Sequence, residues 1–242
     1  MTNRHVVTGR HQHTNELLGM ATPKLLRAWP ACTFTGLKGF APLTISLEDE
    51  DDSPLWLEHK TLGTAVDVVA IPLRTSIDVV SRDHLQWPSA NDHSDALSGR
   101  TVSIDQIIDA EVLCELSPKP RRLTPALELF VLGFPIGWKP LTAPQGAFAV
   151  WCRGSIASEP EIDWDNLPRF LIDSRTRQGQ SGSPVFAFRS YPWEDIEGKM
   201  QFPTTATVEG ELVGIYSGRI HPDSDLGYVW RAATIREILE RV

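Results

Sequence analysis

Short runs of apolar residues, separated by polar stretches rich in glycine and proline, recur along the chain and predict β-strands. The runs that we interpret as strands lie at residues 44–47, 67–73, 127–135, 150–156, 170–173, 185–188 and 212–216. Residues 232–242 differ, because Ile235, Ile238 and Leu239 recur there at helical spacing. The pattern therefore predicts a mostly β protein that ends in a helix.

The stretches between these runs predict loops and linkers. Residues 79–99 are rich in Asp, Ser and His, which is typical of a loop. Residues 101–116 have a mixed pattern that fits a short helix followed by a strand. Residues 117–122 contain two prolines and three basic residues, and we interpret them as a linker between two halves of the chain.

Composition favours one globular unit. The chain has 242 residues, 41% of them hydrophobic, with 18 prolines and 17 glycines, which suits one large all-β domain of short strands joined by turns. Its net charge is −8, and no basic cluster indicates a nucleic-acid partner. The charged run at residues 48–52 is acidic and predicts a solvated loop.

Cysteine usage and hydropathy bear on the compartment. The three cysteines, Cys32, Cys114 and Cys152, cannot all pair within the chain, and we interpret them as small buried thiols. Because no disulfide framework is implied, we expect a reducing, cytoplasmic environment. No stretch is long and apolar enough to span a membrane, and no signal peptide is visible, so we expect no membrane partner.

In one run of the chain a serine stands between two glycines and a proline follows: Gly179-Gln180-Ser181-Gly182-Ser183-Pro184. Gly179 has access to backbone angles that a Cβ forbids, so amide groups can point inward and bind the oxyanion that forms when a serine attacks a carbonyl. Gly182 lets a substrate backbone approach closely. The alternative interpretation is a Gly/Ser surface turn before a strand.

Two segments that precede this run complete a pattern: Thr2-Asn3-Arg4-His5-Val6-Val7-Thr8-Gly9 and Asp67-Val68-Val69-Ala70-Ile71-Pro72-Leu73. Together the three resemble the histidine, aspartate and serine motifs of trypsin-like (chymotrypsin-fold) serine peptidases, in the family's order. Gln180 is similar to the amide residue of bacterial stress-type and glutamyl-type members. Secreted digestive relatives have Asp at this position, so activation by N-terminal clipping is not expected here.

The resemblance implies a chymotrypsin-like double β-barrel in one domain, with the first barrel at residues 1–116, the second at 123–231 and a C-terminal helix at 232–242. It implies His5 as the base, Asp67 as the carboxylate that orients it and Ser181 as the nucleophile. The amides of Gly179 and Ser181 would form the oxyanion hole. These steps need no metal and no organic cofactor.

Two histidines compete for the role of base, since His5 and His11 share a Thr-x-Arg-His pattern. We favour His5, because Val6 and Val7 follow it where the family places its apolar turn. The same pair precedes His11, which stays the alternative. His11 and His13 also form a His-x-His pair, but no neighbouring cysteine or carboxylate cluster completes a metal site, so we predict no metal.

The short N-terminus departs from the family's pattern. Only four residues precede His5, whereas a chymotrypsin-like first barrel has about two strands before its histidine, and a barrel without them has unpaired edges. We therefore expect either an incomplete first barrel in this chain or a natural protein that begins upstream of Met1.

The resemblance also implies a substrate pocket, whose walls are Arg175, Thr176 and Arg177 on one side and Tyr216, Ser217 and Gly218 on the other. We expect Ser217 and Gly218 to offer backbone groups to an extended substrate strand. An inward-facing Arg175 would favour an acidic side chain at the cleavage site, whereas a solvent-exposed arginine is the commoner arrangement.

The sequence thus predicts a serine endopeptidase that acts on protein or peptide substrates. One alternative is a catalytically impaired peptidase-fold module that serves as a binding or scaffold surface. Another is an α/β-hydrolase esterase, but Ser183 stands where its Gly-x-Ser-x-Gly elbow needs glycine, and only His221 follows the serine as a base. The oligomeric state does not follow from the sequence.

Overall fold

The structure, a computed structural model, describes residues 1–28, 31–34, 37–40, 43–72, 123–135, 142–143, 146–147, 149–189, 193–194, 200–201 and 209–240. The predictions for residues 79–99, 101–116 and 117–122, and for Cys114, lie outside these residues. The described elements are mostly strands, accompanied by the helices α1 and α5.

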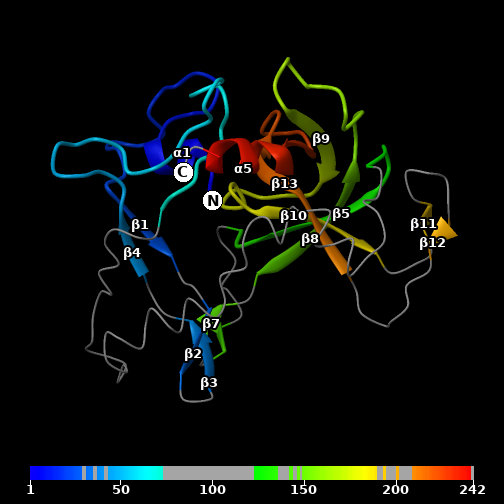
Figure 1. The fold of residues 1–242 in the computed structure, drawn as a ribbon, viewed down its shortest axis with the longest axis horizontal. Coiled ribbons are helices and arrows are strands. Elements are labelled where there is room, and N and C mark those ends of the chain that lie inside the picture. The colour runs from blue at the N-terminus through cyan, green and yellow to red at the C-terminus, as the bar shows by residue number, and fades with distance from the viewer. Residues whose placement is uncertain are drawn as a thin grey trace.

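Six strands close into an antiparallel barrel in the second half of the chain (Figure 1). They are β5 (Glu128–Gly133), β8 (Val150–Ile156), β9 (Arg169–Ser174), β10 (Pro184–Arg189), β13 (Glu209–Arg219) and β14 (Leu226–Arg231). The hydrogen-bonded order is β10-β13-β14-β9-β8-β5, and β5 pairs with β10 to close the ring. Every run that we predicted as a strand beyond residue 123 overlaps one of them.

Alternation of side chains along these strands builds the barrel core. In β5, Leu129 and Val131 are buried while the alternating residues Phe130 and Leu132 are partly exposed, which is the period of two expected for a strand with one inward face. The inward residues pack with those of the other strands, among them Ile156, Phe170, Ile172, Val185, Val213 and Val229. The core is therefore continuous around the barrel.

The first half of the chain is less regular. It contains the short helix α1 (Arg4–Thr8) and two antiparallel strand pairs. The pairs are β1 (Leu25–Ala28) with β4 (Leu43–Ser46), and β2 (Ala31–Phe34) with β3 (Leu37–Phe40). In the described residues of this half the strands do not close into a barrel.

The prediction of a β-strand at residues 67–73 is wrong for the described part of this segment. In the described part of this segment, Val69 bridges Thr2 on one side and Ala70 bridges Leu57 on the other. Each neighbour contributes a single residue pair, so the segment is extended and paired at isolated bridges rather than along a ladder. Its apolar pattern reflects burial, since Val66, Val68 and Val69 are fully buried.

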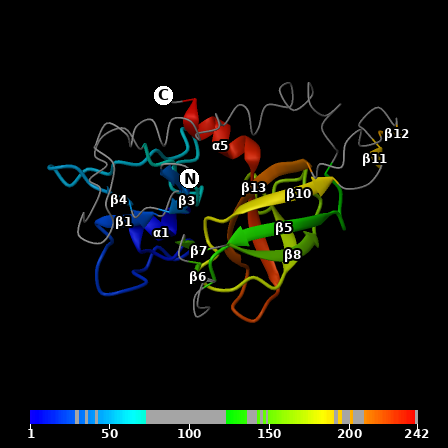
Figure 2. The same cartoon turned by 90° about the horizontal axis from the view of Figure 1, so that it is seen from below.

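The C-terminal helix α5 (Ala232–Leu239) packs between the barrel and this extended segment. Ile235 and Ile238 of α5 lie in one apolar cluster with Val66 and Val68 of the segment and Trp230 of β14. Figures 1 and 2 both show the red α5 between the barrel and the blue N-terminal part. The predicted helix is confirmed, and with the barrel it confirms the predicted mostly β fold class.

Two further strand pairs are small: β6 (Thr142–Ala143) with β7 (Gly146–Ala147), and β11 (Trp193–Glu194) with β12 (Met200–Gln201). Among the described helices none is long and apolar enough to cross a membrane.

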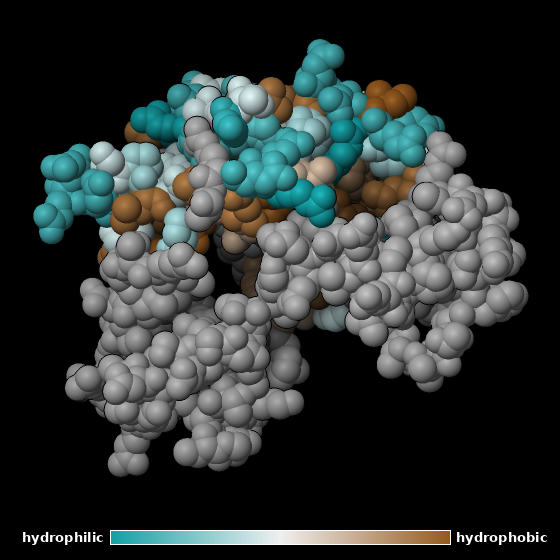
Figure 3. All heavy atoms as spheres, in the orientation of Figure 1, coloured by the Kyte–Doolittle hydropathy of each residue, from teal (hydrophilic) through white to brown (hydrophobic). Residues whose placement is uncertain are grey.

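The acidic run at residues 48–52 lies in a projecting loop, as predicted. Asp49, Glu50, Asp51 and Asp52 are all exposed. The loop extends at the left of Figure 1 and is hydrophilic in the space-filling view of Figure 3.

Candidate active site

Asp67 and His5 form a close pair through two bonds. The Asp67 Oδ2 atom lies 2.6 Å from His5 Nδ1, and Asp67 Oδ1 accepts the His5 backbone N–H at 2.8 Å. A carboxylate only accepts, so Nδ1 carries the ring hydrogen and Nε2 of the neutral ring is left as an acceptor. The Asp67 carboxylate therefore fixes both the backbone and the tautomer of His5.

The local sequence explains how this pair is placed. Thr2 and Val69 exchange two backbone hydrogen bonds, of 3.1 and 2.9 Å, and Arg4 N–H donates to the Asp67 carbonyl at 3.3 Å. Asn3 is fully buried and its Nδ2 donates to the same carbonyl at 2.6 Å. These bonds align the segment before His5 with the segment that carries Asp67.

Alternation along the Asp67 segment decides which way its carboxylate faces. Val66 and Val68 point into the cluster beneath α5, and in extended backbone the side chain between them points to the opposite face. Asp67 is only 5% exposed there, close to His5. The apolar neighbours of Asp67 thus serve to orient it.

The loop that carries Ser181 has the backbone expected for it. Gly179 and Gly182 have φ angles of 92° and 84°, a region that side chains rarely adopt. Within the described part of the chain, the N–H groups of Gly179 and Ser181 have no hydrogen-bond acceptor. Two unpaired donors in one loop are what an oxyanion site requires.

Gln180 shapes this loop from inside. Its side chain is fully buried, its Oε1 accepts the Arg177 N–H at 2.7 Å, and its Nε2 donates to Cys152 Sγ at 3.1 Å. Cys152 is a partly buried free thiol. Neutral hydrogen bonds of the Gln180 side chain thus hold the loop.

The Ser181 loop lies against the segment that leads to His5. A Cβ on Gly182 would stand 2.8 Å from Thr2 Oγ1 and 3.3 Å from the Asn3 nitrogen. The Gly182 N–H also donates to the Tyr216 carbonyl at 2.9 Å, which joins the loop to β13. Among the described residues no hydrogen bond joins Ser181 Oγ to the His5 ring; such bonds often tighten only when substrate is bound.

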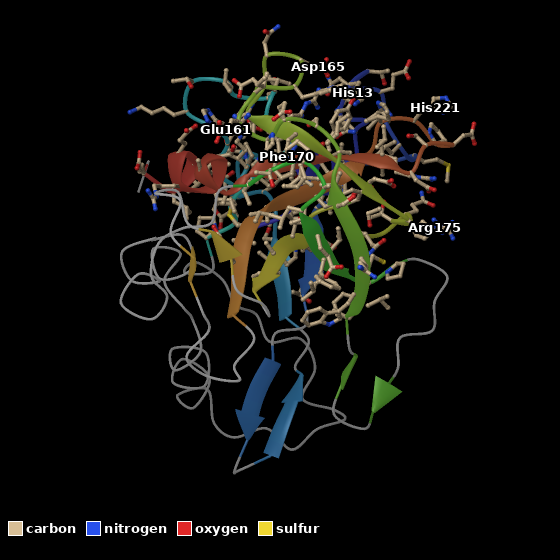
Figure 4. The ribbon with its side chains drawn as sticks, turned by 90° about the vertical axis from the view of Figure 1, so that its right-hand side faces the viewer. His13, Glu161, Asp165, Phe170, Arg175 and His221 are labelled. Atoms are coloured by element: carbon tan, nitrogen blue, oxygen red, sulfur yellow. The ribbon has the colours of Figure 1, made fainter. Side chains whose placement is uncertain are left out.

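The predicted wall residues of the substrate pocket have different surroundings. Arg175 is exposed and projects from the molecule in Figure 4. The Tyr216 side chain is 2% exposed, lies in the barrel core and bonds the Thr176 hydroxyl, and its burial raises the pKa of the phenol. Tyr216 therefore supports the barrel rather than facing a substrate.

Ser217 and Gly218 lie beside the candidate triad. Ser217 Oγ donates to Asp67 Oδ2 at 2.5 Å, so its side chain orients the carboxylate. Gly218 has a φ of 111°, and Ser181 Oγ lies 3.9 Å from the position that its Cβ would take. The structure thus brings these two residues to Asp67 and Ser181, while Arg175 points elsewhere.

His11 does not contact Asp67. It is exposed, and its Nδ1 accepts the backbone N–H groups of His13 and Thr14, both at 3.3 Å. The geometry therefore favours His5 as the partner of Asp67.

Among the described residues no group of three or more His, Cys, Asp or Glu side chains is arranged to hold a metal ion.

His13 lies over the barrel. Its ring meets the Tyr228 ring edge-on, with centroids 5.7 Å apart, and lies near Asp165 in Figure 4. Partial burial of the ring lowers the pKa of His13, and the positive charge of Arg169 lowers it further. The neutral form is thus favoured in this position.

Sequence reasoning missed three contacts of the Asp67 region: those of Asn3, of the Ser217 hydroxyl and of Gln12. Asn3 stands two residues before His5, and that proximity was the available signal. Gln12 and Ser217 are 205 residues apart, and no local pattern links them.

Comparisons with known proteins found similar solved structures but no match to the sequence. No protein-family model matches the sequence, and no curated protein matches it either. Solved structures of Rv3671c, a protease from M. tuberculosis, are similar in part. An inactive form is 20% identical over 52% of this chain and 57% of that chain, with a TM-score of 0.29, so the chain spans little more than half of its length.

The other two comparisons with Rv3671c extend along the whole chain. The active form is 11% identical over 100% of this chain and 88% of that chain, with a TM-score of 0.35. A mutant in the inactive form is 14% identical over 100% of this chain and 94% of that chain, with a TM-score of 0.34. At TM-scores this low the similarity does not identify a function.

Proposed function

We propose that this chain is a trypsin-like serine endopeptidase in which Ser181 is the nucleophile, His5 the base and Asp67 the carboxylate that orients the base. The observation that carries the proposal is the two-point bond between Asp67 and His5, at 2.6 and 2.8 Å. The Ser181 loop, which lies against the segment leading to His5, supports the same assignment. One domain at residues 1–242, with barrels at 1–116 and 123–231, is part of this proposal.

The reaction proceeds in two stages. His5 Nε2 takes the proton from Ser181 Oγ while Oγ attacks the carbonyl carbon of a peptide bond, and Asp67 stabilises the imidazolium that forms. The N–H groups of Gly179 and Ser181 bind the oxyanion. His5 then gives its proton to the leaving amine, which leaves an acyl-enzyme, and water releases the acyl group by the reverse sequence of proton transfers. No step needs a metal or an organic cofactor.

The substrate is a protein or peptide segment in extended form. Beyond Tyr216, β13 has an edge that no described strand covers, and Ser217 and Gly218 lie on it next to Ser181. A peptide strand that pairs with this edge presents its carbonyl to Ser181.

A serine-directed fluorophosphonate probe tests this function. We expect the probe to label the purified chain, and we expect labelling to disappear in Ser181→Ala and to fall by about 10³-fold or more in His5→Ala, because the loss of either group removes the activated nucleophile. His11→Ala is the matched control and should label like the unmodified chain, because His11 does not touch Asp67.

Two results would contradict the assignment. Labelling that is lost in His11→Ala but kept in His5→Ala would move the base to His11. No labelling of a chain with an intact β-type circular dichroism spectrum would instead favour the peptidase-fold binding module.

A further inference from the structure

The side-chain amide of Gln12 lies against Ser217 and near Gly218, on the part of β13 that approaches Ser181. It contacts Ser217 Oγ at 2.8 Å, and its end lies 3.9 Å from the position that a Cβ of Gly218 would take. Ser181 Oγ lies at the same distance of 3.9 Å from that position. Gln12 and Ser181 therefore both lie close to Gly218, at the end of β13 where an extended substrate would pair.

The hydrogen-bonding capacity of Ser217 decides how this amide is oriented. The Ser217 hydroxyl has one hydrogen, and it donates that hydrogen to Asp67 Oδ2 at 2.5 Å. The contact between Ser217 Oγ and Gln12 is therefore donated by the amide nitrogen. In this orientation the nitrogen also lies 3.2 Å from the Ser217 carbonyl oxygen and 3.0 Å from Asp67 Oδ2.

The Ser217 carbonyl is an acceptor that a peptide strand needs. Pairing of β13 with β14 shifts register between Tyr216 and Gly218, so Ser217 has no partner in β14. On the other edge, the bonds from the Ser181 loop end at Tyr216. A peptide strand added to this edge next to Ser181 would donate a backbone N–H to the Ser217 carbonyl, which is where the Gln12 amide now donates.

Neighbouring residues hold Gln12 in this place. The Gln12 amide oxygen accepts from His13 Nε2 at 3.2 Å, and the His13 ring rests on Tyr228 of β14. The turn at residues 11–14 is closed by bonds to His11 Nδ1 and at its base by the Arg10–Leu17 bridge. Gln12 is thus presented by a turn that is not part of the barrel and in which His11, His13 and Thr14 are exposed.

We propose that Gln12 is a built-in competitor of the substrate, which occupies the Ser217 carbonyl until a peptide strand displaces the turn at residues 11–14. This inference rests on the proposed function, because it concerns access to the same nucleophile. It makes Gln12 a residue that sets the affinity for extended substrates.

The experiment compares two rates in Gln12→Ala and in the unmodified chain. One is kcat/KM for hydrolysis of fluorescein-labelled casein, which needs the β13 edge. The other is the rate of fluorophosphonate labelling, which needs only Ser181 and its base. Because one competing hydrogen bond is removed, we expect the ratio of casein hydrolysis to labelling to rise by about three- to tenfold.

Thr14→Ala is the matched control, since Thr14 lies in the same turn and, among the described residues, its hydroxyl forms hydrogen bonds only with the side chain and backbone of Glu16. It should leave the ratio unchanged. If casein hydrolysis and labelling both fall together in Gln12→Ala, Gln12 supports the Asp67 carboxylate and the competitor role is overturned. An unchanged ratio with both rates preserved overturns it as well.

A binding measurement separates this inference from the proposed function. Fluorescence anisotropy of fluorescein-labelled casein peptides is measured with Ser181→Ala and with Ser181→Ala combined with Gln12→Ala, so that no chemistry is required. The double variant should bind about three- to tenfold more tightly. Equal affinities overturn the competitor role even if the unmodified chain labels, and tighter binding supports it even if the chain does not label.

Discussion

Replacing Asp67 with asparagine is expected to lower the rate of fluorophosphonate labelling of Ser181 by about 10⁴-fold. Asp67 accepts hydrogen bonds from His5 Nδ1, the His5 backbone N–H and the Ser217 hydroxyl. The asparagine amide has one accepting oxygen and one NH₂ group, so its NH₂ group faces at least one of these donors. An NH₂ group that faces His5 Nδ1 disfavours the tautomer with the hydrogen on Nδ1, in which Nε2 can accept the serine proton.

The control for this change is Asp173→Asn, because Asp173 is exposed on β9. It should label at the unmodified rate. Both variants should keep the circular dichroism spectrum of the unmodified chain, since neither carboxylate lies in the barrel core. Labelling of Asp67→Asn within about tenfold of the unmodified rate would show that Asp67 does not orient the base.

Replacing Ile238 with alanine is expected to lower the free energy of unfolding by about 2–5 kcal/mol. Ile238 is fully buried on α5, where it packs with Val66 and Val68 and with Trp230 of β14. The cavity left by alanine removes contacts on both sides of the helix. Urea denaturation followed by tryptophan fluorescence measures the change.

Ile162→Ala is the matched control for Ile238→Ala, because Ile162 is 67% exposed. Its free energy of unfolding should change by less than about 0.5 kcal/mol. An Ile238 variant as stable as this control would contradict the role of α5 as the link between the barrel and the Asp67 segment. Since Val66 and Val68 flank Asp67, we also expect slower labelling of Ser181 in the Ile238 variant.

The two proposals together describe a site that is assembled but partly covered. Acyl transfer requires a base and an oxyanion site, here the Asp67–His5 pair and the amides of Gly179 and Ser181. Within the described part of the chain these amides have no acceptor, and no strand covers the edge of β13 beside them. Gln12 lowers access to that edge through its contacts with Ser217 of β13. The unmodified chain is therefore expected to react with small probes more readily than with extended peptides.

The sequence predicted well those strands in which apolar and polar residues follow a local pattern of burial. The run at residues 127–135 became β5, with Leu129 and Val131 inward, and the run at residues 212–216 became part of β13. The run at residues 67–73 carries the same apolar signal, but its described residues pair only at isolated bridges. A local pattern reports burial, whereas a ladder also depends on which distant segment lies alongside.

The choice between His5 and His11 shows the same limit at the site. Both stand in a Thr-x-Arg-His pattern, so the local sequence treats them nearly alike. In the structure α1 presents His5 to the Asp67 carboxylate, while His11 Nδ1 caps its own exposed turn. The pairing depends on the Thr2–Val69 bridge, which joins residues far apart in the chain.

The sequence by itself determined the mostly β class, the C-terminal helix and the candidate residues Asp67 and Ser181, with His5 favoured over His11 as the base, because each of these follows from a short pattern of residue types. Only the tertiary structure decided that Ser217 binds Asp67, that Tyr216 is a core residue and that Gln12 contacts Ser217. Those relations join residues about 150 and 205 positions apart, and they arise when the barrel, α5 and the N-terminal segment pack together.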